Sequence, residues 1–156
     1  MPPDPTRIYD SPFPFEEERI RAVAVYCSDG RLGVQFDDLL HNVLGLPRYD
    51  RLAVPGGAAC LASNFQTYRE QEALVEQLRF LIDVHGLERV VLIAHENCAF
   101  YSHRLRVSPL QLETKQREDM LKAVGRVNSL SSTLKIQAFF ARIGERGGVR
   151  FEQVDV

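Results

Sequence analysis

Three runs of apolar residues divide the chain and predict its buried strands. Residues 20–27 (IRAVAVYC) and 89–95 (RVVLIAH) are almost continuously apolar and rich in valine, and residues 51–54 (RLAV) form a shorter run. Runs that do not alternate between apolar and polar positions are typical of strands covered on both faces, as in a parallel sheet. We therefore expect parallel strands from these segments.

Two further strands are predicted in residues 133–156, at the end of the chain. The first of them alternates apolar and polar positions, which suits an edge strand with one covered face. The residues of its apolar face are Leu134, Ile136, Ala138 and Phe140. A Gly-Gly pair at 147–148 predicts the turn between the two strands.

Segments with helical periodicity lie between the strands. Residues 34–45 and 58–68 predict short helices, and residues 70–85 predict a longer one that ends at Gly86. Its apolar stripe consists of Leu74, Leu78, Leu81 and Ile82. A polar helix is expected to begin near Pro109, because proline suits the first turn. Strands and helices alternate, so we expect a single α/β domain, with a mostly parallel central sheet flanked by helices and a C-terminal edge strand pair.

The N-terminal segment differs in composition from the rest of the chain. Five of the eight prolines fall within residues 1–15, and such segments favour extended backbone without a core of their own. We predict an extended arm over residues 1–18 and a domain over residues 19–156. The first residues carry neither the basic start nor the apolar core of a secretion signal.

Composition and charge exclude several classes of function. Hydrophobic residues make up 45% of the chain and charged ones 26%, as in ordinary globular proteins. The net charge of −2 provides no general basic field for nucleic acid or an anionic membrane, and no apolar run approaches the roughly 20 residues of a membrane span. Three cysteines do not make a disulfide framework, so we expect a reduced, cytoplasmic protein whose clustered Cys and His serve a metal or catalysis.

Cysteine and histidine residues stand at the ends of two predicted strands. Cys27 ends the first strand, His95 ends the third, and Cys98 follows three residues later in the turn. Functional groups gather beyond the carboxyl ends of parallel strands, so we expect these side chains to meet. Two sulfurs and one imidazole are the ligand set of a catalytic zinc ion, which keeps its fourth position open.

Asp29 and Arg31 closely follow Cys27 and allow two arrangements. Asp29 could be a fourth zinc ligand, or it could lie beside the metal and accept a hydrogen bond from zinc-bound water. In either case, Arg31 would keep Asp29 ionised through a charge-assisted pair. Zinc lowers the pKa of bound water from 15.7 to about 7, which suits the hydration of a small electrophile such as carbon dioxide.

These motifs resemble those of the β-class carbonic anhydrases, in which Cys-x-Asp-x-Arg is followed by His-x-x-Cys. The chain carries them as CSDGR (27–31) and HENC (95–98), and the similarity includes the PGGAA segment at 55–59, the long helix before the third strand and the closing strand pair. The resemblance implies a homodimer or higher homo-oligomer with active sites near the subunit interface. It also implies that zinc is bound by Cys27, His95 and Cys98, and that the catalytic dyad is Asp29 and Arg31.

Two segments depart from the family's pattern. After the second strand, where family members usually carry an Arg-Asn-Ala-Gly-like segment, residues 53–57 (AVPGG) contain neither arginine nor asparagine. After Cys98, the family's usual glycine is replaced by Ala99, which is followed by two bulky aromatic residues. These departures concern the substrate side of the centre rather than the metal ligands.

Several other residues have more than one interpretation, or a structural one. Gly56 and Gly57 either form a tight turn with positive φ or bind bicarbonate or another anion through their N–H groups. Cys60 is expected in the core, and residues 113–119 (ETKQRED) are expected to be a solvated helical face. The remaining structural residues are the core or interface aromatics Phe65, Tyr68, Phe100 and Tyr101, the helix-end His85 and the exposed His103.

Three alternatives to carbon dioxide hydration stay open. The same centre could hydrolyse carbonyl sulfide or carbon disulfide, which a narrow apolar entrance at Phe100 and Tyr101 would favour. The chain could bind zinc without turnover, because it lacks the usual polar segment near Val54. Thiol catalysis by Cys27 is the third alternative, but phosphatase-like loops carry arginine six residues after the cysteine, where this chain has Gly33.

Overall fold

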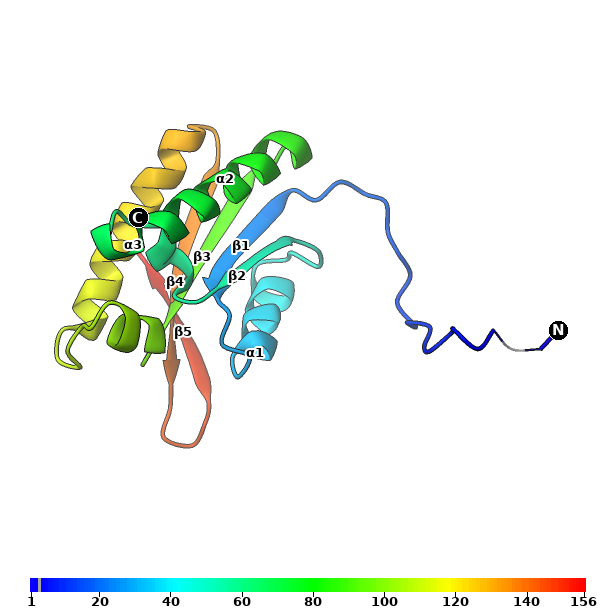
Figure 1. Ribbon diagram of the computed structural model, residues 1–156, viewed down its shortest axis with the longest axis horizontal. Coiled ribbons are helices and arrows are strands. Elements are labelled where there is room, and N and C mark those ends of the chain that lie inside the picture. Colours follow the sequence, from blue (N-terminus) through cyan, green and yellow to red (C-terminus); the bar gives the residue numbers. More distant parts are fainter. Residues whose placement is uncertain (3) are drawn as a thin grey trace.

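A sheet forms the centre of the computed structural model, which describes residues 1–2 and 4–156 (Figure 1). Its strands are β1 (Ala22–Cys27), β2 (Asp50–Val54), β3 (Arg89–His95), β4 (Lys135–Ile143) and β5 (Val149–Val154). Their spatial order is β2–β1–β3–β4–β5. The first four strands run parallel, and β5 runs antiparallel to β4. The predicted α/β class, mostly parallel sheet and C-terminal strand pair are confirmed.

Helices cover both faces of this sheet. Helices α2 (Tyr68–His85) and α3 (Leu112–Leu130) pack on one face, and α1 (Gly33–Asp38) packs on the other (Figure 1). Helix α1 continues into a π-helical turn at Leu39–Val43. The α2 helix ends where the sequence predicts, because Gly86 adopts the left-handed conformation (φ 61°) that caps a helix.

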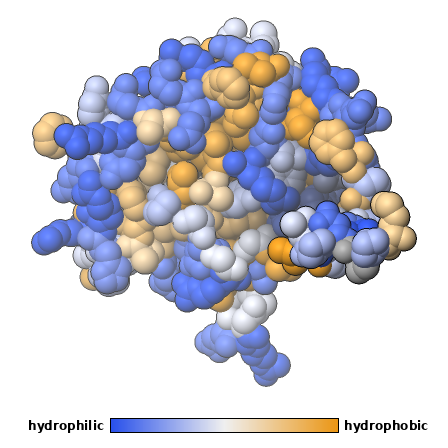
Figure 2. Space-filling model, turned by 45° about the vertical axis from the view of Figure 1, so that its right-hand side comes forward, coloured by the Kyte–Doolittle hydropathy of each residue, from blue (hydrophilic) through white to orange (hydrophobic). Residues whose placement is uncertain are grey.

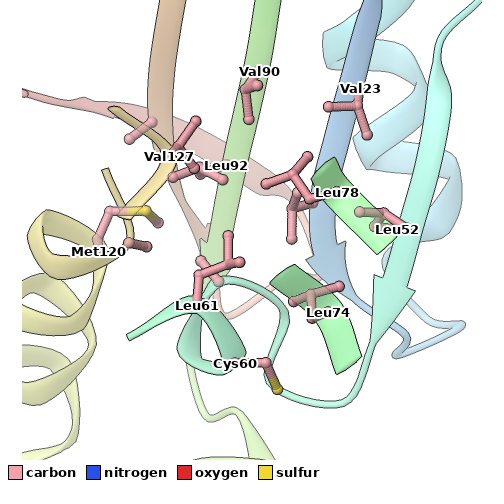
Figure 3. Packing of buried hydrophobic residues seen from close by; sticks show 14 of the residues in the cluster. Val23, Leu52, Cys60, Leu61, Leu74, Leu78, Val90, Leu92, Met120 and Val127 are labelled. Carbon is pink, nitrogen blue, oxygen red and sulfur yellow. The ribbon is translucent and has the colours of Figure 1, made fainter. Parts of the chain in front are cut away.

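The strands are continuously apolar because their two sets of side chains enter different halves of the core. Val23 and Val25 of β1 belong to a cluster with Leu74 and Leu78 of α2, part of which is seen in Figure 3. The alternate positions of β1 point to the opposite face, where they pack with Phe36 of α1. A strand buried on both faces needs apolar residues at every position, as the sequence predicts.

Residues 58–68 do not form the predicted helix. They contain short 3₁₀ turns at Gly57–Leu61 and Phe65–Thr67, and the chain between these turns is extended at Ala62 and Asn64 (ψ 147° and 121°). The run from Ala58 to Ala62 is buried at every residue rather than along one stripe. Tertiary packing of this kind overrides the helical propensity of alanine and leucine.

Two further expectations are corrected by the structure. Strand β4 is not an edge strand, because it pairs with β3 on one side and with β5 on the other. Phe139, which the alternation placed on an uncovered face, is buried in the cluster around α1. Pro109 does not begin the polar helix either; it lies in a turn in which Gln111 N–H donates to the Ser108 carbonyl, and α3 begins at Leu112.

The N-terminal segment extends away from the sheet (Figure 1). Its side chains from Asp4 to Arg19 are exposed, and the Arg48 guanidinium contacts its base by donating to the carbonyls of Glu16 and Glu18. Pro3, which belongs to the predicted arm, lies outside the described residues. No helix in the described part of the chain is long and apolar enough to cross a membrane.

Candidate metal centre

Two neighbouring strand ends bring together the three predicted metal ligands. Cys27 is the last residue of β1, and His95 is the last residue of the adjacent parallel strand β3. Cys98 follows in the turn that leads away from β3. The ligand atoms of these three residues all lie within 4.8 Å of one another, and the two sulfurs are 4.0 Å apart. The structure therefore forms the cluster that the strand-end argument predicts.

The His95 side chain offers its Nε2 atom to this cluster. The ring is almost completely buried, and its Nδ1 lies 2.7 Å from the carbonyl oxygen of Glu96. Because a carbonyl can only accept, Nδ1 carries a hydrogen, and in the neutral ring, the form that binds a metal, Nε2 has the lone pair. Nε2 is buried and has no hydrogen-bond partner within the described residues. A buried ring nitrogen without a partner, beside two sulfurs, fits a zinc ion.

The two sulfurs differ in their affinity for a proton. Their mutual hydrogen bond lowers the pKa of Cys27 and raises that of Cys98, and burial further raises the pKa of Cys98. The His95 ring and the backbone of Gly56 and Asp29 also lower the pKa of Cys27. The pair thus favours one thiolate at Cys27, the form in which cysteine binds a metal. A bound cation would release the second proton.

Asp29 and Arg31 form a two-point ion pair at the edge of the cluster. Arg31 Nε donates to Asp29 Oδ1 at 3.0 Å, and Arg31 Nη2 donates to Oδ2 at 2.7 Å. These hydrogen bonds lower the pKa of Asp29 to about 2. The Asp29 side chain is 20% exposed and that of Arg31 is 85% exposed, so the arginine approaches from the solvent side.

A cavity of about 270 Å³ connects this ion pair with His95. Asp29 and His95 line it together with Gln35, Asn97 and the turn between β4 and β5. The amide oxygen of Gln35 is buried and has no partner in the described part of the chain. Asn97 has a positive φ of 54°, which is uncommon outside glycine and turns the chain sharply between His95 and Cys98. The cavity has room for a small polar molecule beside the cluster.

Gly56 and Gly57 adopt the positive φ that one interpretation of the sequence predicts (80° and 51°). A Cβ at Gly56 would collide with the Phe100 ring, and one at Gly57 would lie 2.7 Å from the carbonyl carbon of Tyr26. Glycine is therefore required here for close approach as well as for φ. The Gly56 backbone is one of the groups that lower the pKa of Cys27. Anion binding at this turn stays a prediction.

The residues that were expected to have structural roles lie partly in the core and partly on the surface. Cys60 is buried in the core, as expected, and its thiol contacts the Pro55 carbonyl at 3.4 Å. His85 ends α2 and lies 2.6 Å from an Asp50 carboxylate oxygen, and His103 is exposed. Phe65 and Tyr68, expected in the core or at an interface, have exposed side chains and so lie outside the core.

The aromatic residues after Cys98 have different environments. Phe100 is half-buried and lines an apolar cavity of about 460 Å³ with Val54 and Pro55. Tyr101 is buried, and its hydroxyl donates to Asp119 at 3.1 Å. Tyr101 is therefore part of the core rather than of an entrance.

The prediction of a solvated face at residues 113–119 is wrong for two residues. Gln116 and Asp119 are buried, and Gln116 Nε2 donates to the His95 carbonyl at 2.8 Å. Both residues share the buried face of α3 with Leu112, Met120 and Ala123. The sequence positions of these buried residues have helical spacing, but because Gln116 and Asp119 are polar, the sequence did not identify them as part of a buried face. Sequence reasoning also missed Glu96, whose carbonyl accepts the hydrogen bond from His95.

Comparisons with known proteins give a solved structure of similar fold and a distant curated relative. A solved structure, the β-carbonic anhydrase CafA of the fungal pathogen Aspergillus fumigatus, is similar in fold, with a TM-score of 0.50 and 15% identity. The similarity covers 89% of this chain and 78% of that one. Among curated proteins, an uncharacterized protein of Rickettsia conorii is 27% identical over 95 residues. That match covers 60% of this chain, which spans about half (49%) of the relative's length.

A family model assigns the chain more directly. The model, described as "Putative carbonic anhydrase", matches residues 17–150 and so includes both strand-end motifs. The expected resemblance to β-class carbonic anhydrases is confirmed by this match together with the shared fold. The chain belongs to this carbonic anhydrase family, as a divergent β-class-like member.

Proposed function

We propose that Cys27 Sγ, His95 Nε2 and Cys98 Sγ bind one zinc ion, and that the chain is a carbonate dehydratase, a lyase that reversibly hydrates carbon dioxide to bicarbonate. The observation that carries this proposal is the convergence of two sulfurs and an unpaired ring nitrogen within 4.8 Å. Three protein ligands with N and S donors are the set found in catalytic rather than structural zinc sites. Family membership supports the same reaction.

Asp29 and Arg31 are proposed as the groups that orient the attacking oxygen. Zinc in such a centre supplies a Lewis acid that lowers the pKa of water to about 7. Because the pKa of Asp29 is about 2, its carboxylate is ionised at neutral pH and can only accept a hydrogen bond. Arg31 engages both carboxylate oxygens, which favours a place for Asp29 beside the metal rather than on it.

The cavity beside Asp29 suits a small substrate. The side chains that line it offer an ionised carboxylate at Asp29, a guanidinium at Arg31 and an amide at Gln35. In the reaction, carbon dioxide and water give bicarbonate and one proton, and this proton leaves to the buffer. Bicarbonate, which has hydroxyl and oxyanion groups, can interact with both charged side chains and with the Gln35 amide.

The test combines metal analysis with a carbon dioxide hydration assay. We expect about one zinc ion per chain by ligand count, and loss of both zinc and activity in Cys27→Ser. Cys60→Ala is the matched control, because Cys60 is a buried cysteine outside the cluster, and it should retain both. Zinc retained in Cys27→Ser, or a wild-type protein without zinc affinity, would contradict the proposed centre.

A zinc protein without turnover is the alternative that a specific observation favours. The Phe100 ring lies directly over Gly56, and Val54 and Pro55 offer no polar side chain near it. Full zinc occupancy with hydration at the buffer rate would support this alternative. Parallel assays with carbonyl sulfide and carbon disulfide would show whether the centre instead acts on these gases.

We also propose that the protein is a cytoplasmic homodimer or higher homo-oligomer. Apolar side chains are exposed on the arm (Ile8, Tyr9, Phe13 and Phe15) and on or near α2 (Phe65, Tyr68, Phe80 and Val84). Figure 2 shows that apolar side chains lie among hydrophilic ones on one face of the molecule. Exposed apolar surface of this kind is typical of association sites. The three free cysteines suit a reducing compartment.

A further inference from the structure

The peptide that follows His95 is attached to β4 at several points. The His95 Nδ1–H donates to the Glu96 carbonyl, so the position of Glu96 determines the orientation of the His95 ring. The Glu96 N–H donates to the Ala141 carbonyl at 3.0 Å. One Glu96 carboxylate oxygen accepts from the Ile143 N–H at 2.9 Å, and the other pairs with Arg142 Nη1 at 3.1 Å. Glu96 is thus held by three consecutive residues of β4.

Arg142 is fixed in turn by two other elements. Its Nη2 donates to Glu113 of α3 at 2.5 Å, and its Nε donates to Glu152 of β5 at 2.6 Å. The Arg142 side chain is about three-quarters buried. Three carboxylates on one guanidinium limit its movement, because the planar group has its donors in fixed directions. The anchor for Glu96 is therefore rigid.

We infer that Glu96, anchored by Arg142, is a positioning residue for His95. It places the hydrogen on Nδ1 and aims the Nε2 lone pair at the sulfurs of Cys27 and Cys98. This role rests on the proposed zinc centre, since it acts through one of its ligands. Groups that hydrogen-bond a ligating histidine typically contribute 10- to 100-fold in metal affinity. Glu96 accepts through its backbone carbonyl, and its own side chain anchors that peptide to β4.

The experiment compares Glu96→Ala with Glu113→Ala. Both variants remove one carboxylate from Arg142, but only Glu96 touches the peptide that accepts from His95. Competition with a chromophoric chelator should show zinc affinity reduced about tenfold in Glu96→Ala, which keeps the accepting carbonyl but removes its anchor. The reduction should be smaller in Glu113→Ala, which leaves two carboxylates on Arg142. Glu96→Gln keeps one acceptor oxygen and should lie between wild type and Glu96→Ala. It also decides the matter if the alanine variant does not fold.

A second readout does not depend on metal. Long-range proton–nitrogen NMR spectra at pH 9, without zinc, should place the hydrogen of the wild-type His95 on Nδ1. The Glu96→Ala variant should show a mixture of tautomers. Wild-type affinity and tautomer in Glu96→Ala, or an equal loss of affinity in Glu113→Ala, would overturn the inference. A wild-type chain that binds no zinc would instead refute the proposed function, while the tautomer comparison would still test the role of Glu96.

Discussion

The three cysteines of this chain show that the role of a residue depends on its contacts rather than on its type. Cys27, Cys60 and Cys98 are all free cysteines, yet of these three only Cys27 and Cys98 share a cluster with His95. Burial raises the pKa of the Cys60 thiol to about 11, so this thiol stays protonated. The hydrogen bond from Cys98 lowers the pKa of Cys27. The same side chain thus packs in the core in one place and is proposed to bind a metal in another.

Asp29→Asn tests the proposed dyad. The amide has the same shape but no charge, so it orients the attacking oxygen poorly, and we expect kcat/KM for hydration to fall about 100-fold or more. Zinc content should not change. Asp83→Asn, an exposed carboxylate of α2, is the control. Because the pKa of Asp29 is about 2, wild-type activity should show no loss attributable to this group above about pH 4. Full activity in Asp29→Asn would remove it from the mechanism.

Gly56→Ala tests the close packing around the cluster. The methyl group would meet the Phe100 ring, and alanine is strained at φ 80°. We expect the free energy of unfolding to fall by about 1–3 kcal/mol, measured by urea denaturation. Gly125→Ala is the control, because this α3 glycine has open space around its Cα and alanine favours helix. An unchanged midpoint for Gly56→Ala would show that the turn is adaptable.

At the scale of elements, long apolar runs were predictable and short buried connections were not. The strands β1 and β3 lie close to their expected ranges, since a continuous apolar run between helices has few other solutions. Residues 58–68, by contrast, do not form the helix that their sequence predicts. The small and apolar residues of this segment suit a helix locally, but Ala58, Cys60 and Leu61 instead pack into the core beside α2 and α3 as part of a 3₁₀ turn.

The ion pairs that join α3, β4 and β5 should make the free energy of unfolding decrease as the pH falls into the acid range. Hydrogen bonds from Arg142 lower the pKa values of Glu113 and Glu152 below the ordinary 4.5. Each lowered pKa stabilises the fold above pH 4.5, and this stabilisation is lost as the pH falls through the folded-state pKa. Urea midpoints between pH 7 and 3 should therefore fall more steeply in wild type than in Arg142→Gln. Arg146→Gln, which removes an exposed hairpin charge, should retain the wild-type slope.

At the scale of the whole molecule, the extended arm and the proposed oligomer belong together. Phe13 and Phe15 are more than 80% exposed, a costly arrangement for two large apolar side chains in water. The arm is held at its base by Arg48, so these residues stand clear of their own sheet. A surface on a second copy would cover them.

Light scattering after size exclusion should give at least a dimeric mass for the wild-type protein. We expect Phe13→Ser with Phe15→Ser to weaken association at least tenfold, because burying each phenylalanine contributes about 1.5–3 kcal/mol. Leu110→Ser is the control, since Leu110 is equally exposed but lies in the turn before α3. A monomeric wild-type protein at high concentration would refute the proposed assembly.

The sequence by itself determined the α/β class, the parallel strands and the residues that meet at their carboxyl ends. These features follow from apolar runs and from the direction of the chain, which are local properties. Only the tertiary structure decided that Gln116 and Asp119 are buried, that β4 is internal and that β4 anchors Glu96, whose carbonyl accepts from His95. Each of these depends on contacts between segments far apart in the chain, and a polar side chain shows its partner only when the fold has brought the two together.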